Sequence, residues 1–119
     1  MQYVMLVYQG TTPLPNTPEW DALAPEEQQR VYADYAELNR AEGLMPGPPL
    51  GLPSDATTVR VDNGTPITTD GPYVDQKGAV GGFFVLGAED LDAAVAVAAR
   101  VPAARLGGAI EIRPCAKYW

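Results

Sequence analysis

The sequence predicts an α+β fold, a ferredoxin-like βαββαβ sandwich with an extra hairpin. Its segments follow the order strand, helix, broken strand pieces, strand, helix, strand, which is the order of the split βαβ arrangement. Residues 3–8 (YVMLVY) and 80–86 (VGGFFVL) are apolar without alternation, as expected for the two central strands. Residues 109–113 (AIEIR) alternate strictly, which is typical of a strand with one solvated face.

The first helix is predicted over residues 25–42. Pro25 suits the first helical position, because its missing N–H has no partner there in any case. Gly43 is expected to end the helix, since glycine readily adopts the left-handed backbone of a C-terminal cap. Apolar side chains at i, i+4 and i+7 mark its buried face: Val31, Tyr35 and Leu38.

The second helix is predicted over residues 90–101, with acidic residues at its start and Pro102 after its end. Its many alanines allow close approach to the sheet. Four residues are expected on its buried face: Leu91, Ala94, Val95 and Ala98.

The middle of the chain predicts irregular strands and a tight turn. Residues 44–53 hold several prolines, which restrict them to an edge or a bulged strand. Residues 57–61 alternate, and residues 67–69 return after a hairpin turn at Asn63-Gly64, a pair that favours the type I′ geometry. The proline-rich segment 9–20 is predicted to be a loop held down by Trp20.

Length and charge limit the function. A chain of 119 residues fits one domain, residues 1–119. The formal charge of −7, from 15 acidic and 8 basic residues, opposes binding to nucleic acid and to anionic membranes. No apolar run is long enough to span a membrane and no signal peptide is recognisable. With a single cysteine, Cys115, a reducing and cytoplasmic location is expected.

The chain contains no histidine. This removes the commonest general base near neutral pH and the commonest zinc ligand. It also excludes Ser-His and Cys-His nucleophile pairs within the chain. We therefore predict no metal site and no cofactor.

The two central strands predict a dimer. Two helices cover only one face of a four-stranded sheet, yet residues 3–8 and 80–86 are apolar on both faces. A bare apolar sheet face is rare in monomers. A second copy packed sheet against sheet would cover it, and a two-fold homodimer is the commonest arrangement.

The stretch from Thr69 to Phe83 reads TDGPYVDQKGAVGGF. It resembles the YCII-related family, in particular its DGPF branch. The similarity also includes the opening strand and the motifs around residues 25–27, 57–60, 90–94, 102–104 and 111–114. Tyr73 replaces the branch's Phe, and Asp75 and Gly78 replace two Glu residues. The resemblance implies a ferredoxin-like subunit that pairs as a dimeric α/β barrel. It also implies a mostly unassigned role and a frequent link to extracytoplasmic-function sigma factors.

The DGP stretch allows two interpretations. In the structural one, Asp70 accepts a hydrogen bond from the backbone N–H two residues on, Gly71 supplies an unusual φ, and Pro72 stiffens the loop. A phosphate cradle is disfavoured, because the glycines precede a strand rather than a helix. In the functional interpretation, Asp70 or Asp75 lies at the barrel mouth as a desolvated general acid or base.

The candidate site residues follow from the functional interpretation. Asp70 and Asp75 are the candidate catalytic residues. Lys77 would bind an anionic ligand or form a salt bridge with Asp75 or Glu111, and Arg113 is either paired or a carboxylate clamp. The candidate ligand-binding residues are Tyr8, Gly71, Pro72, Tyr73, Lys77 and Arg113.

Three functions remain open at the level of the sequence, of which the third is a purely structural, dimeric scaffold element. One is a homodimer that binds a small organic ligand in a cleft between sheet and helices, near the DGP loop, with or without acid–base chemistry. Another is a regulatory protein-interaction module linked to an extracytoplasmic-function sigma factor. The residues do not decide whether the protein is an enzyme.

Overall fold

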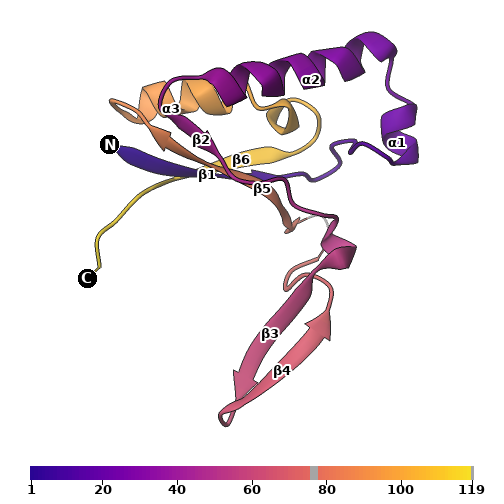
Figure 1. Ribbon diagram of the computed structural model, residues 1–119, viewed down its shortest axis with the longest axis vertical. Helices are drawn as coiled ribbons and strands as arrows, with labels where there is room; N and C mark the ends of the chain where they lie inside the picture. The colour runs from indigo at the N-terminus through magenta and orange to yellow at the C-terminus, as the bar shows by residue number, and fades with distance from the viewer. Residues whose placement is uncertain (76–77, 119) are drawn as a thin grey trace.

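The computed structural model describes residues 1–75 and 78–118. Its main sheet is antiparallel, with the strand order β2-β5-β1-β6. Two helices, α2 (Pro25–Arg40) and α3 (Leu91–Ala98), cover one face of it (Figure 1). The four strands are β1 (Gln2–Tyr8), β2 (Leu44–Pro46), β5 (Val80–Gly87) and β6 (Ala109–Pro114). The predicted α+β order is confirmed, with the two apolar runs at the centre of the sheet.

The remaining elements lie in the connections. They are α1 (Pro18–Asp21), the 3₁₀ turns η1 (Pro53–Asp55) and η3 (Pro102–Ala104), and the hairpin strands β3 (Thr57–Asp62) and β4 (Thr65–Asp70). The helix α1 was not predicted. Thr17 caps it, because its hydroxyl oxygen accepts a hydrogen bond from the Trp20 N–H at 3.3 Å.

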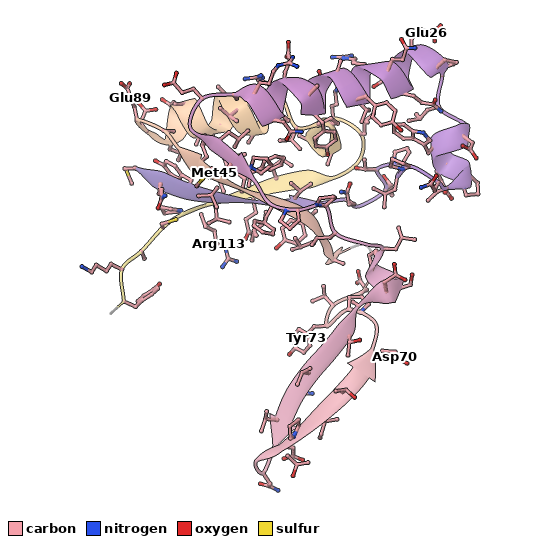
Figure 2. The ribbon with its side chains drawn as sticks, in the orientation of Figure 1. Glu26, Met45, Asp70, Tyr73, Glu89 and Arg113 are labelled. Atoms are coloured by element: carbon pink, nitrogen blue, oxygen red, sulfur yellow. The ribbon has the colours of Figure 1, made fainter. Side chains whose placement is uncertain are left out.

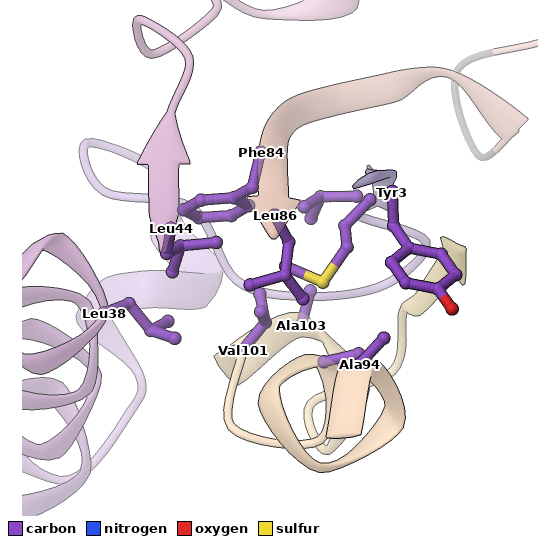
Figure 3. Close-up of a cluster of buried hydrophobic side chains, with 11 residues drawn as sticks. Tyr3, Leu38, Leu44, Phe84, Leu86, Ala94, Val101 and Ala103 are labelled. Carbon is purple, nitrogen blue, oxygen red and sulfur yellow. The ribbon is translucent and has the colours of Figure 1, made fainter. Parts of the chain in front are cut away.

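The register of β1 and β5 separates the two faces of the sheet. Met5 pairs with Phe84 and Tyr3 with Leu86, and these four side chains are buried beneath the helices. Figure 3 shows them in the core with residues from α2, α3 and η3. Met5 and Leu38 are completely buried, and Ala94 and Ala98 of α3 belong to the same cluster, so the core lies between the sheet and both α2 and α3.

The opposite face of the sheet, here called the open face, carries no helix in the described chain (Figure 1). Its neighbouring pairs include Val4 with Val85 and Leu6 with Phe83. These apolar side chains are only partly buried, and Met45 is 59 % exposed. The open face consists of Val4, Leu6, Tyr8, Met45, Phe83, Val85, Glu111 and Arg113. The expected apolar surface opposite the helices is therefore present in the subunit.

The first long helix ends two residues earlier than predicted. α2 stops at Arg40, and Ala41 already has an extended backbone. Gly43 has a φ of +81° and turns the chain into β2, so the predicted left-handed glycine is present just beyond the helix end. Val31 and Leu38 are buried and Tyr35 is partly buried, as the periodicity predicted.

The predicted buried face of the second helix was wrong in part. Ala94 and Ala98 are buried, but Leu91 and Val95 are 55 % and 49 % exposed. The buried stripe continues instead to Val101. Alanine allows the helix to lie close to the sheet, and this close packing turns the bulkier Leu91 and Val95 outward.

The hairpin of β3 and β4, here called the arm, stands apart from the main sheet on the side away from the helices (Figure 1). Asn63 and Gly64 have φ values of +48° and +79°, which confirms the predicted type I′ turn. The radius of gyration is 16.1 Å, whereas a compact chain of this length has about 13.5 Å. The arm accounts for this excess.

Candidate functional site

The DGP loop begins where the arm ends. Gly71 donates its N–H to the Ala56 carbonyl at 2.7 Å, and its own carbonyl accepts a hydrogen bond from the Thr58 hydroxyl at 2.7 Å. Its φ is +100°, and a Cβ at this position would meet nothing within 4 Å. Backbone conformation rather than space therefore requires glycine here, as the sequence predicted.

The expected turn at Asp70 was wrong. The residue two positions on is Pro72, which has no N–H to donate. Asp70 instead ends β4 and pairs with Thr57 across the arm. Its side chain is exposed, so the desolvation that a general acid or base requires is not present within the subunit.

Asp75 takes the structural role that was expected of Asp70. Its Oδ1 accepts a hydrogen bond from the Gly78 N–H at 2.8 Å, and its carbonyl oxygen accepts from the same group at 3.1 Å. The carboxylate therefore shapes the turn that leads into β5. Asp75 is also exposed.

A cleft of about 570 Å³ lies beside the DGP loop. Tyr8, at the end of β1, lines it together with Pro72 and Tyr73 of the loop. Three predicted ligand-binding residues from two distant parts of the chain therefore meet around one space, here called the loop cleft. It lies near the DGP loop as expected, but no residue of α2 or α3 lines it, so it is not the space between sheet and helices that was predicted. Its other lining residues are Leu50, Gly51, Leu52, Pro53, Asp55, Ala56, Val74, Gly78, Ala79 and Val80.

The predicted charged residues that the structure describes do not gather at the loop cleft. Arg113 donates from Nε to Oε2 of Glu111 at 2.7 Å, on the open face, so Arg113 is paired. Figure 2 shows Asp70 on the arm and Arg113 beneath the sheet, well separated. Neither they nor Asp75 line the cleft. Lys77, the fourth candidate, lies outside the described residues.

One wall of the loop cleft was missed by sequence reasoning. It comes from residues 50–56, which the prolines indicated only as an irregular strand. Asp55 folds this segment back, because its Oδ2 accepts a hydrogen bond from the Leu52 N–H at 3.3 Å. Leu50 and Leu52 are 46 % and 45 % exposed. The available signal in the sequence was the presence of leucines in a proline-rich segment that was expected to be irregular.

Among residues 1–75 and 78–118, no group of three or more histidine, cysteine, aspartate or glutamate side chains could hold a metal ion. Within the same residues, no helix has both the length and the apolar character needed to cross a bilayer.

Comparison with known proteins gives a consistent picture. The model of the YCII-related domain matches residues 1–117. An uncharacterized protein of Rhizobium meliloti (strain 1021), R00369, is 31 % identical over 123 residues, covering 99 % of this chain and 94 % of that protein. Both similarities extend over almost the whole chain, so they include the sheet, the arm and the DGP loop together.

Proposed function

This chain belongs to the YCII-related family, and we propose that it acts as a homodimer that binds a small organic ligand in the loop cleft. The observation that carries the ligand proposal is the meeting of Tyr8 with Pro72 and Tyr73 around about 570 Å³. Cavities of this size suit small organic molecules, and ring surfaces with a few polar groups are their usual lining.

The dimer proposal rests on the open face and the arm. Apolar side chains of the two central strands form an uncovered sheet surface, and the arm leaves the sheet on that same side (Figure 1). An isolated two-stranded hairpin is marginally stable in water, and Val59, Val61 and Ile67 of the arm are all about half exposed or more. A second copy would cover the open face and support the arm.

The two proposals are connected by Tyr8. It belongs to the open face and it also lines the loop cleft, so a second copy on the open face would form a further wall of the cleft. Asp70 and Asp75 are exposed in the subunit. They would take part in acid–base chemistry only where the second copy buries them, and the proposal therefore assigns binding to the cleft.

A charge on the open face tests the dimer. Val85→Lys places an ammonium group in the proposed interface, and Val95→Lys makes the same change on the exposed surface of α3. We expect sedimentation equilibrium at micromolar concentration to give a dimer for the wild type and Val95→Lys and a monomer for Val85→Lys. A wild-type monomer, or a Val85→Lys dimer of unchanged affinity, would contradict the dimer.

Two loop variants test the ligand site. A thermal-shift screen of small organic metabolites should find compounds that stabilise the wild type, since a ligand bound only to the folded state raises the melting temperature. Tyr73→Ala removes a side chain that lines the cleft and is 77 % exposed, and Asp70→Ala removes a neighbouring carboxylate that does not line it. The shift should disappear in the first and remain in the second; equal shifts in all three proteins would exclude this cleft.

A further inference from the structure

A second cleft, of about 550 Å³, lies on the helix side of the sheet. Trp20 of α1 and Val31, Tyr32 and Tyr35 of α2 line it, together with Phe84 of β5. We call it the aromatic cleft. Val7 lines it whereas the next residue, Tyr8, lines the loop cleft, so the two spaces lie on different sides of β1. Phe83 of the open face also borders the aromatic cleft. Leu50 is the only described residue common to both linings.

The aromatic rings are held in place by the fold. Trp20 is 6 % exposed, and its ring meets that of Tyr32 edge to face with centroids 5.4 Å apart. Gln28 donates from Nε2 to the Trp20 carbonyl at 2.8 Å, which fixes α1 against α2. The cleft therefore has a preformed ring surface, which reduces the conformational entropy that a ligand loses on binding.

No residue that lines the aromatic cleft in the described chain carries a charged side chain. An ionic group placed there would lose its hydration without gaining an opposite charge, which is costly. The protein as a whole is also acidic, with a formal charge of −7. The chemistry of the lining therefore selects against anions and favours an uncharged molecule.

The polar side chains that line the aromatic cleft are all uncharged: Gln9, Thr12, Tyr32, Tyr35 and Asn39. The Thr12 Oγ1 is itself buried, with no hydrogen-bond partner among the described residues, so it is not exposed to the cleft. The amide and phenol groups of the other side chains can donate a hydrogen bond to a ligand.

We propose that the aromatic cleft binds a neutral, flat aromatic molecule of two or three rings. A cavity of about 150 Å³ accepts a single benzene ring, so the volume of about 550 Å³ admits several rings. This site is independent of the loop cleft, and its ligand need not touch the DGP loop or a second copy.

A pair of dyes tests the charge selection. N-phenyl-1-naphthylamine is neutral, and 1-anilinonaphthalene-8-sulfonate has the same rings with an added sulfonate. Fluorescence titration of the wild type should give a dissociation constant at least about tenfold lower for the neutral dye, because the sulfonate has no partner in the cleft. Equal affinity, or tighter binding of the sulfonate, would overturn the proposal.

Two glycines of β5 locate the bound dye. Gly82 lines the aromatic cleft, and a Cβ there would meet nothing within 4 Å, so Gly82→Leu is expected to occupy part of the cleft. Gly87 lies at the other end of β5, where a Cβ would make only ordinary contact, 3.9 Å from the Gly43 carbonyl oxygen. Gly82→Leu should weaken binding of the neutral dye about tenfold or more, and Gly87→Leu should leave it unchanged. Equal binding to both variants would place the dye elsewhere.

The dye experiments on the aromatic cleft can be distinguished from the thermal-shift experiments on the loop cleft. Tyr73→Ala should leave dye binding intact, and Gly82→Leu should leave thermal shifts from loop-cleft ligands intact, because neither residue lines the other cleft. A dye that responds to Tyr73→Ala and not to Gly82→Leu would overturn the aromatic cleft while supporting the loop cleft.

Discussion

The rings of Trp20 and Tyr32 meet edge to face, with centroids 5.4 Å apart and an interplanar angle of 71°. Trp20 comes from a proline-rich connection and Tyr32 from α2, so this contact fixes an otherwise irregular segment against a helix. The same two rings form part of the wall of the aromatic cleft. One packing interaction therefore serves both stability and the shape of a binding surface.

Trp20 should dominate the stability of this region. Trp20→Ala is expected to lower the free energy of unfolding by about 3–5 kcal/mol, because a buried indole is replaced by a cavity. Tyr32→Ala should cost only about 1 kcal/mol, since Tyr32 is 57 % exposed and loses mainly the ring pair. Urea unfolding followed by circular dichroism measures both, and equal losses would contradict the assignment of Trp20 as the anchor.

Gly71 should be far less tolerant of substitution than Gly82. A Cβ meets nothing within 4 Å at either position, but only Gly71 has a left-handed φ, +100°. Gly71→Ala is therefore expected to destabilise by about 1–3 kcal/mol, whereas Gly82→Ala should be neutral or stabilise by about 0.5 kcal/mol. Thermal and urea unfolding measure the stability of the two variants. Similar stabilities would contradict a strained backbone conformation at position 71.

Arg105 should connect the end of η3 to α2. Its guanidinium lies 2.7 Å from Glu27 and 2.9 Å from Asp34, and all three side chains are less than one-third exposed. Arg105→Gln is expected to cost about 1–2 kcal/mol. Arg100→Gln is the control, because the 3.8 Å pair of Arg100 with Glu37 is more exposed and should contribute about 0.5 kcal/mol or less.

Salt distinguishes an electrostatic loss from a packing loss at Arg105. Screening at about 1 M NaCl should reduce the cost of Arg105→Gln measured by urea unfolding. A cost that is unaffected by salt would mean that the aliphatic part of the side chain, and not the ion pairs, carries the effect.

The sequence predicted the main sheet because each of its signals is local. The doubly apolar runs of β1 and β5, the alternation of β6 and the Asn63-Gly64 turn each depend on residues close together in the chain. The open face could be predicted from the number of elements, because two helices cannot cover both faces of a four-stranded sheet. These predictions required no knowledge of long-range contacts.

The sites were harder to predict, because they depend on where connections fold in space. Asp70 was expected to form the turn, but Pro72 cannot donate and Asp75 takes that role through Gly78. A cleft between sheet and helices was expected, but the lining of the aromatic cleft could not be named from the sequence. Its walls come from the segment 9–20, α2 and β5, and periodicity indicates only that Val31 and Tyr35 face inward. Similarly, Leu91 was expected to be buried, and the close approach of Ala94 to the sheet turned it outward.

Tyr35 should make the stability fall in alkaline solution. Burial raises the pKa of its phenol above the ordinary value of 10.0, so as the pH rises above about 10 the unfolded chain loses this proton before the folded chain does. The native state then binds more protons than the unfolded state, and the free energy of unfolding decreases with pH until the folded pKa is passed. Below about pH 9 the contribution is fully present and constant. Tyr35→Phe cannot ionise, so its unfolding free energy from urea titrations at about pH 8 to 11 should fall less steeply than that of the wild type. Tyr73→Phe, which alters an exposed ring, should follow the wild type, and a slope for Tyr35→Phe equal to both would contradict a buried phenol.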